Sequence, residues 1–386
     1  MTVYLDHNAT TPLAPEALEA MLPFLGGLFA NPSSPHAAGT LARHAVGDAR
    51  GAVAGLIGAR AAEIVFTASA TEANHTAILG TLRAIAEAAP ARRHLVTTAV
   101  EHPASLLLFA ELERQGWRVS VLPVNGAGRI ALDDLRAVVD ETTALVSVMW
   151  ANNETGVLMP VAPAADIAQA RGALFHTDAV QAAGRVPVDV AAVNADLLTL
   201  SAHKLHGPMG AGALYVRKGK PFAPLLHGHQ ERGRRGGTEN VPAIVGFGAA
   251  ALLAQRALRD GIGAAMAERR DRLERGILAR WPGSAVNGAG AERLPNTSNI
   301  RFADAGGRPA DAEELLVRLD RAGIQVSMGA ACASGGNRPS HVLTAMGLSA
   351  ADAAASLRFS LGRDTTDAEV AAVLSELPPL FARMAA

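Results

Sequence analysis

Short apolar runs alternate with helical patterns along the chain from residue 63 onward. The run EIVFTAS at 63–69 is typical of a buried strand. After it, apolar residues recur at spacings of four, three and four from Ile78 to Ala89, which places them on one face of an amphipathic helix. The pattern therefore predicts a strand followed by a helix that begins near Thr71.

The same alternation repeats several times. Three more strand-like segments, at 94–100, 117–124 and 143–150, are each followed by a helix-like segment, at 104–116, 132–139 and 161–172 respectively. Further strand-like runs lie at 173–180 and 196–202. Repeated units of this kind favour a mostly parallel sheet covered by helices. We therefore expect a large α/β domain.

The pattern changes after about residue 255. A charged helical segment at 267–281 precedes strand-like runs at 296–303 and 322–328, with a helical segment between them and two more near the end. The length of 386 residues also favours two or three structural units, at about 150 residues per domain. We expect a large domain at 16–255 and a smaller α+β domain. The small domain comprises 1–15 and 256–386, and a continuous helix joins it to the large one.

Composition and charge exclude several classes of protein. The formal net charge of −1 gives no overall attraction to nucleic acid or to an anionic membrane. The longest uncharged apolar stretch, Val241 to Ala254, is too short to span a bilayer, for which about 20 residues are needed. A single cysteine cannot form a disulfide within the chain, and the N-terminus lacks the apolar core of a signal peptide. A cytoplasmic protein is expected, with no membrane or nucleic-acid partner.

Polar residues follow the ends of the expected strands, where ligands bind in sheets of this kind. The segment TASATE at 67–72 ends a strand and opens a helix, whose free backbone amides favour a phosphate. The later strands are followed by His102, Asn153, Asp178, Gln181, Ser201, His203 and Lys204. Pyridoxal phosphate requires a lysine for its Schiff base, a carboxylate for its pyridine nitrogen and a phosphate site. Each residue is a weak signal by itself, but the ordered set is specific.

The motifs of the whole chain resemble those of the cysteine desulfurases, most closely the NifS branch of the NifS/IscS group. They are YLDHNATTP, NPSSPH, VSVMWANNETG, FHTDAVQAAG, SAHKLHGP, HQERGRRGGTENV, LPNTSNI and LRFSLGR, in this order. The resemblance implies the fold type I of pyridoxal-phosphate enzymes, similar to class V aminotransferases. It also implies conversion of L-cysteine to L-alanine, with the sulfur left as a persulfide on Cys332.

The resemblance implies a role for each residue. Lys204 would bind the cofactor, Asp178 would pair with its pyridinium, and His102 would stack on its ring and move protons. Asn153 and Gln181 would lie near its phenolic oxygen, and Asn153 also near the substrate. Arg358 would bind the substrate carboxylate. The phosphate would be held by Ala70, Thr71, Ser201 and His203, and by Thr238 of a second subunit.

Partners and metals also follow from the resemblance. It implies a homodimer that passes sulfur to a scaffold protein of the NifU or IscU type for iron–sulfur cluster assembly, with nitrogenase maturation as one destination. No resident metal site is expected, although Cys332 could transiently ligate an iron–sulfur cluster. Two alternatives stay open: a related enzyme such as an aminotransferase or selenocysteine lyase, and a catalytically weak sulfur carrier.

The cysteine loop, at about 326–338, departs from the family pattern. Met328, Ala330 and Ala333 replace three hydroxyl residues around Cys332. A lone cysteine is more often a small buried apolar residue than a nucleophile. The neighbouring glycines and the order of the motifs favour the nucleophile here. Two further features, the pair His227 and His229 and the arginines of 232–235, lack the ligands of a zinc site and the aromatic residues of a nucleic-acid surface.

Overall fold

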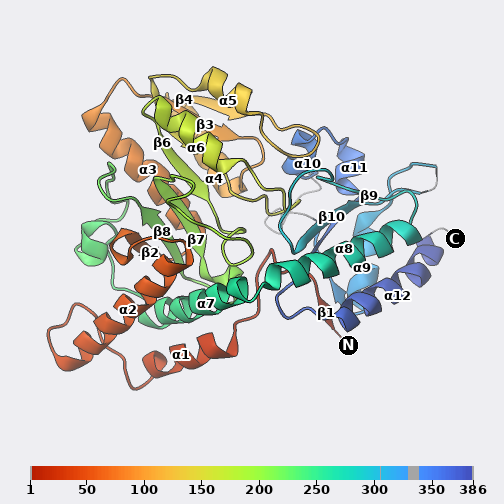
Figure 1. Ribbon diagram of the computed structural model, residues 1–386, viewed down its shortest axis with the longest axis horizontal. Helices are drawn as coiled ribbons and strands as arrows, with labels where there is room; N and C mark the ends of the chain where they lie inside the picture. The colour runs from red at the N-terminus through yellow and green to blue at the C-terminus, as the bar shows by residue number, and fades with distance from the viewer. Residues whose placement is uncertain (1, 305, 329–338, 385–386) are drawn as a thin grey trace.

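Two parts lie side by side in the molecule (Figure 1). Helix α7 (Val241–Arg259) packs in the larger part, and α8 (Ile262–Arg280) packs in the smaller part. The structure is a computed structural model. It describes the backbone of residues 2–304, 306–328 and 339–384, and the side chains of these ranges up to residue 377.

The larger part is built on a sheet of seven strands within the described residues, in the order β2-β8-β7-β6-β5-β3-β4. The strands from β7 to β4 run parallel, and β8 is antiparallel to both of its neighbours. The expected mostly parallel sheet is confirmed. The strands are β2 (Ile64–Thr67), β3 (His94–Thr98), β4 (Arg118–Leu122), β5 (Thr143–Ser147), β6 (Leu174–Asp178), β7 (Leu197–Ser201) and β8 (Gly212–Val216).

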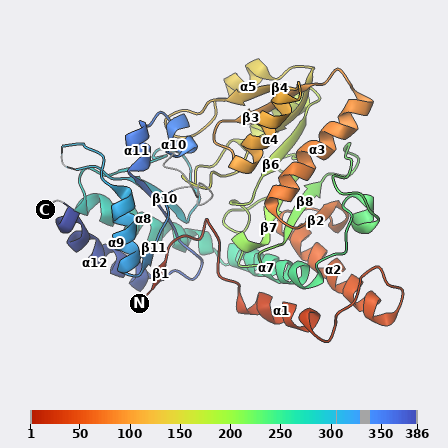
Figure 2. The same ribbon diagram turned by 180° about the vertical axis from the view of Figure 1, so that it is seen from behind.

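Helices bury both faces of this sheet (Figure 2). Neighbouring strand residues point to opposite faces, so Leu197 packs in one apolar core and Leu198 in the other. One core includes residues of α3 and α4, and the other includes residues of α2, α5, α6 and α7. The bounds are α1 (Pro15–Leu25), α2 (Ala37–Leu56), α3 (Ala70–Ala88), α4 (Pro103–Arg114), α5 (Leu132–Val138), α6 (Val161–Ala170) and α7 (Val241–Arg259), with short 3₁₀ helices η1 (Ala61–Glu63), η2 (Ala202–Lys204) and η3 (Gln230–Gly233).

The smaller part contains two small sheets, ordered β12-β10-β9 and β1-β11 in the described residues. Its apolar core joins residues from both ends of the chain, such as Leu5, Phe302 and Phe359. The elements are β1 (Val3–Tyr4), α8 (Ile262–Arg280), β9 (Ala285–Val286), β10 (Thr297–Arg301), α9 (Ala312–Arg321), β11 (Ile324–Gln325), α10 (His341–Ala345), α11 (Ala350–Ala354), β12 (Ser356–Ser360) and α12 (Asp367–Met384).

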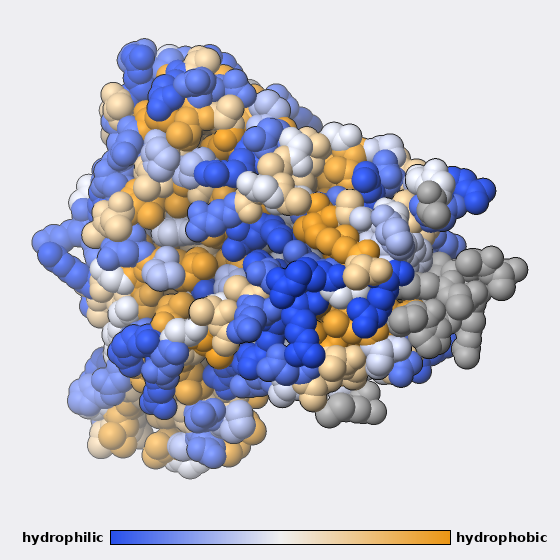
Figure 3. All heavy atoms as spheres, turned by 45° about the vertical axis from the view of Figure 1, so that its right-hand side comes forward, coloured by the Kyte–Doolittle hydropathy of each residue, from blue (hydrophilic) through white to orange (hydrophobic). Residues whose placement is uncertain are grey.

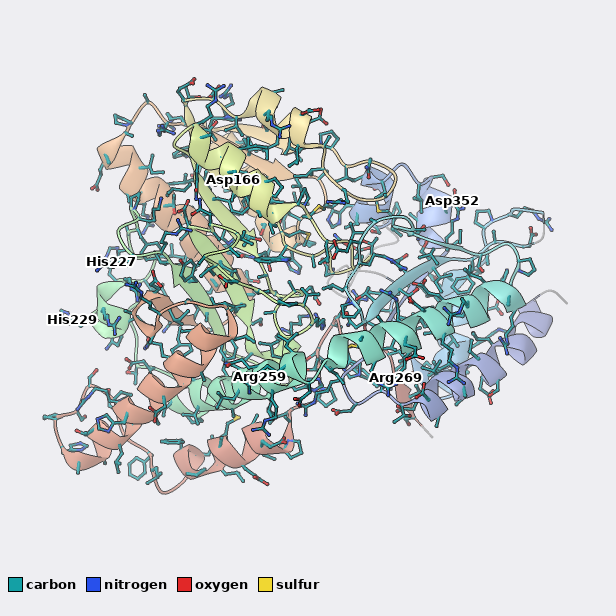
Figure 4. The ribbon with its side chains drawn as sticks, in the orientation of Figure 1. Asp166, His227, His229, Arg259, Arg269 and Asp352 are labelled. Atoms are coloured by element: carbon teal, nitrogen blue, oxygen red, sulfur yellow. The ribbon has the colours of Figure 1, made fainter. Side chains whose placement is uncertain are left out.

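The expected continuous helix between the two parts is wrong. Helix α7 ends at Arg259, and α8 begins at Ile262 after Asp260 and Gly261. Gly261 has a φ of 76°, a left-handed conformation that ends a helix and that glycine adopts without strain. Figure 4 shows Arg259 on α7 and Arg269 on α8. The exact division at 15/16 and 255/256 stays a prediction.

Helix α7 contains the apolar stretch of the sequence and is a packed helix. By length and composition it is the one described helix that could cross a membrane, but half of its most apolar window is buried inside the protein. Gly246 and Phe247 are among its buried residues. On the face in Figure 3, apolar and polar residues are interspersed.

Candidate active site

A cavity of about 570 Å³ lies at the carboxyl ends of the parallel strands. The fold brings together ten of the residues that the sequence singled out. Those lining the cavity are Ala70, Thr71, His102, Asn153, Asp178, Gln181, Ser201, His203, Lys204 and Arg358. Nine of them come from the larger part, and Arg358 comes from β12 of the smaller part. The cavity therefore combines residues from both parts.

One end of the cavity is suited to a phosphate. Ala70 and Thr71 form the first turn of α3, where backbone amides and the helix dipole attract an anion. Ser69 caps this helix by accepting a hydrogen bond from the amide of Glu72 at 3.1 Å. Ser201 and His203 line the same cavity from the end of β7 and from η2.

Asp178 ends β6 and is nearly buried, at 8% exposed. Asn74 Nδ2 donates to Asp178 Oδ2 at 2.7 Å, and the Val180 amide donates to Oδ1 at 3.0 Å. Two donors thus fix the orientation of the carboxylate. Asn74, which the sequence analysis did not single out, also lines the cavity.

Lys204 lies at the end of η2, directly after β7. Its Nζ donates to the carbonyl oxygens of Asn8 at 2.6 Å and Ala9 at 2.5 Å. The hydroxyl of Thr10 lies 3.0 Å from His203 Nδ1. Residues 8–10 belong to the family motif YLDHNATTP, but no role was predicted for them. Their place in the cavity, like that of Asn74, was not predicted.

His102 caps α4 at the edge of the cavity. Its Nδ1 accepts a hydrogen bond from the Ala104 amide at 3.2 Å, so the proton of the neutral ring lies on Nε2. Burial lowers the pKa of His102, an effect that nearby Lys204 reinforces and Asp178 opposes. The preceding residue, Glu101, is also buried, and burial raises its pKa to about 8.

Arg358 is almost fully buried, at 1% exposed. Its Nη2 donates to Asp6 Oδ1 at 2.6 Å, and its Nη1 donates to the Asn153 carbonyl at 3.0 Å. Gln181 is held nearby, since its Nε2 donates to the Asn8 carbonyl and its Oε1 accepts from Arg185. This corner of the cavity therefore has a preorganised cationic group.

One predicted residue, Thr238, is not brought into the cavity. Thr238 lines a smaller neighbouring cavity of about 110 Å³, which shares Ala68, Gly210 and Ala211 with the main one. Cys332 lies outside the described residues, as do Ala330 and Ala333. Met328 is described and packs against the core of the smaller part.

The remaining polar motifs lie elsewhere. His227 and His229 lie at the outer edge of the larger part, far from α8 (Figure 4). Within the described residues, no group of three or more histidine, cysteine or acidic side chains could hold a metal. Of the arginines at 232–235, Arg235 pairs with Glu72 at 2.8 Å and Arg234 donates to backbone carbonyls. These side chains bind the chain itself.

Comparison with known proteins gives the family. Residues 3–373 match the class-V aminotransferase family. A cysteine desulfurase of Cereibacter sphaeroides is 52% identical, with 100% of this chain and 97% of the relative covered. The cysteine desulfurase NifS of Azotobacter vinelandii is 46% identical, with 99% and 93% covered. The chain belongs to the class-V aminotransferase family, among its cysteine desulfurases.

Solved structures agree with this placement. A NifS-like protein superposes with a TM-score of 0.90 at 35% identity, covering 99% of this chain and 100% of that one. The expected fold type I of pyridoxal-phosphate enzymes is confirmed. So are the expected kind of enzyme and its cofactor.

The cavity of this cysteine desulfurase fits pyridoxal phosphate. Lys204 would bind its aldehyde, Asp178 its pyridine nitrogen, and the first turn of α3 with Ser201 and His203 its phosphate. The buried Asp178 carboxylate accepts bonds from two donors and still faces the cavity. A cationic ring nitrogen would give this buried carboxylate an opposite charge.

Proposed function

We propose that the chain removes the sulfur of L-cysteine, releases L-alanine and transfers the sulfur to Cys332. The convergence of Lys204, Asp178, His102 and Arg358 on one cavity carries this proposal. The set contains a cofactor lysine, a counter-ion, a proton carrier and a carboxylate clamp. A pure sulfur carrier has no physical need for such a set.

Each side chain has a task that its surroundings support. Arg358 binds the substrate carboxylate through its remaining N–H groups, a geometry that suits a guanidinium. Lys204 Nζ would move protons at the substrate carbons. His102 lines the cavity, and burial lowers its pKa, which favours the neutral ring with its proton on Nε2. Bound pyridoxal phosphate supplies the electron sink that weakens the bonds at the substrate α-carbon.

Cys332 accepts the sulfur when its own side chain is a thiolate. Its sulfur attacks the substrate sulfur, so that an S–S bond forms as the C–S bond breaks. The electron pair of the broken bond stays with the substrate β-carbon, which takes up a proton and becomes the methyl group of alanine. The thiolate is the reactive form of the nucleophile.

We further propose a homodimer in the cytoplasm that delivers sulfur to a scaffold protein for iron–sulfur cluster assembly. Large apolar side chains are exposed on α1 and in the segment after it, among them Leu22, Leu25 and Phe29, which is 78% exposed. A second subunit covering this surface would explain their exposure. Thr238 lies outside the main cavity of its own chain, in keeping with the proposed contribution to a partner's phosphate site.

The sulfur transfer can be tested on the intact chain, because Cys332 is its only cysteine. Incubation with L-cysteine should add one sulfur atom to the peptide that contains residue 332, as measured by mass spectrometry. The variant Cys332→Ala should gain no sulfur and should form almost no alanine. It should retain the visible absorption of bound cofactor, which shows that the site is intact.

Two outcomes would contradict the proposal. Full production of alanine and sulfide by Cys332→Ala would remove the cysteine from the mechanism. A substrate panel in which selenocysteine or another amino acid is processed and L-cysteine is not would favour the related enzymes instead.

A further inference from the structure

Asp6 is the acidic side chain that pairs with Arg358 in the described residues. By volume, Arg358 is the largest of the fully buried side chains there. The carboxylate of Asp6 accepts from its Nη2 at 2.6 Å, and the Asn153 carbonyl accepts from its Nη1 at 3.0 Å. A buried cation needs such partners, because leaving water is costly for a charge.

The backbone holds Asp6 in register with the strand of Arg358. Residue 6 pairs with Ser360 of β12, two positions beyond Arg358. The Ser360 amide donates to the Leu5 carbonyl at 2.7 Å, and the His7 amide donates to the Ser360 carbonyl at 3.1 Å. The residues before and after Asp6 are therefore both hydrogen-bonded to Ser360. Because the backbone is held at both positions, the Asp6 carboxylate has little freedom to move away from the guanidinium.

The pairing leaves part of the guanidinium free in a fixed plane. A guanidinium has five N–H groups, two on each terminal nitrogen and one on Nε. Asp6 and Asn153 accept from different terminal nitrogens, so each of these nitrogens keeps a second N–H. Together, two such groups can form the parallel fork that binds a carboxylate.

Asp6 stands behind Arg358 as seen from the cavity. Arg358 lines the main cavity with the cofactor residues, whereas Asp6 lines a separate outer pocket with Tyr4 and Gln325. A substrate in the main cavity would therefore contact the arginine and not the aspartate. Asp6 contacts Arg358 directly, so we expect it to act on the substrate through Arg358.

We propose that Asp6 is a positioning residue that orients Arg358 for the substrate α-carboxylate and so makes the site selective for amino acids over simple amines. This inference rests on the proposed role of Arg358. It adds Asp6, which lies near the opposite end of the chain from Arg358, to the residues that determine which substrates the site accepts.

The test compares two ligands that differ only in the carboxylate. L-Alanine and ethylamine are titrated into the cofactor-loaded enzyme, and binding is followed by the change in cofactor absorption. Asp6→Asn should weaken L-alanine about tenfold, the range expected for one charge-assisted hydrogen bond, and leave ethylamine within about twofold. With L-cysteine as substrate, KM should rise more than kcat falls. Asp6→Glu, which keeps the charge, should restore part of the preference for L-alanine.

Asp364 provides a matched control. It follows β12, is exposed, and pairs with Arg363 at the surface. Asp364→Asn removes the same charge nearby and should leave both affinities unchanged. Thermal unfolding of each variant checks that the fold is kept, and if Asp6→Asn does not fold, Asp6→Glu carries the comparison, with an intermediate loss of L-alanine affinity expected.

The outcomes separate this inference from the proposed function. If Arg358→Lys reduces the preference for L-alanine and the Asp6 variants do not, Asp6 has no positioning role. Equal weakening of both ligands by Asp6→Asn would show a general structural effect and would overturn the inference in the same way. If Arg358→Lys itself leaves the preference unchanged, the proposed carboxylate site is wrong, and the role of Asp6 is wrong with it.

Discussion

Asn74 shows how a residue without charge can control the site. It lies on α3, is buried, and donates to Asp178 Oδ2 at 2.7 Å. This bond fixes the plane of the carboxylate that would face the cofactor nitrogen. The sequence contains Asn74 within a helical pattern and gives no sign of this contact, because the two residues lie 104 positions apart.

Replacing Asn74 should therefore weaken cofactor binding. Asn74→Leu, of similar size, removes the donor and should lower the affinity for pyridoxal phosphate about tenfold, as expected for a bond to a charged group. Equilibrium dialysis with absorption of the bound cofactor measures this. Thr81→Val on the same helix is the control, since Thr81 is buried and its hydroxyl has no partner in the described part of the chain. Unchanged affinity in Asn74→Leu would contradict the prediction.

At the scale of elements, glycines set how closely helices pack. Helices α2 and α7 approach at Gly248, where an added Cβ would lie 2.6 Å from the Ala49 Cα and 2.7 Å from its Cβ. Both of these atoms belong to α2, so the two helices would have to move apart to make room for the added Cβ. The close approach brings α7 onto α2 and buries the apolar face of α7.

Gly248→Ala should therefore lower the free energy of unfolding, by about 1–3 kcal/mol for overpacking of this kind. Gly47→Ala is the matched control on α2, because Gly47 is exposed and an added Cβ would meet nothing within 4 Å. The control should stabilise the helix by about 0.5–1 kcal/mol. Urea unfolding followed by circular dichroism measures both. A neutral Gly248→Ala would mean that the two helices can move apart without cost.

At the scale of the whole molecule, a buried histidine couples stability to pH. His176 lies in β6 between Ser147 Oγ at 2.8 Å and Thr199 Oγ1 at 3.1 Å, on strands on either side. Burial lowers its pKa to about 4, against 6.5 in an unfolded chain. Between these values the unfolded state binds a proton that the folded state does not. The stability that His176 contributes is therefore present above pH 6.5 and is lost as the pH falls toward 4.

The pH dependence gives a test. From pH 7 to pH 5, His176 should reduce the free energy of unfolding by about 2 kcal/mol, at 1.4 kcal/mol for each unit below the unfolded pKa. In His176→Gln, the difference between the two pH values should shrink by about this amount. Ser147→Ala keeps the titrating ring and should keep the wild-type difference even if it is less stable at both pH values. If His176→Gln lost as much stability between pH 7 and pH 5 as the wild type, a group other than His176 would be responsible for the acid sensitivity.

The pattern of apolar and polar residues, together with the family motifs, was enough to predict the α/β architecture and ten of the residues that line the cavity. Alternating apolar runs predicted the strands and helices from 63 to 202. The residues after each strand were sufficient to predict a pyridoxal-phosphate site. This worked because parallel strands end at one edge of a sheet, so order along the chain translates directly into neighbours in space. Lys204, Asp178 and His102 are examples. Arg358 entered through the family motifs.

The contacts that hold these residues in place become visible in the folded structure and not in the sequence. Asn8 and Ala9 contact Lys204 from almost 200 positions away. Asp6 contacts Arg358 from 352 positions away, and Asn74 contacts Asp178 from 104. The helix expected to join the two parts is broken at Gly261. Local patterns encode which face of an element is buried, but pairings between distant segments arise when packed elements bring polar groups out of water and each must find a partner.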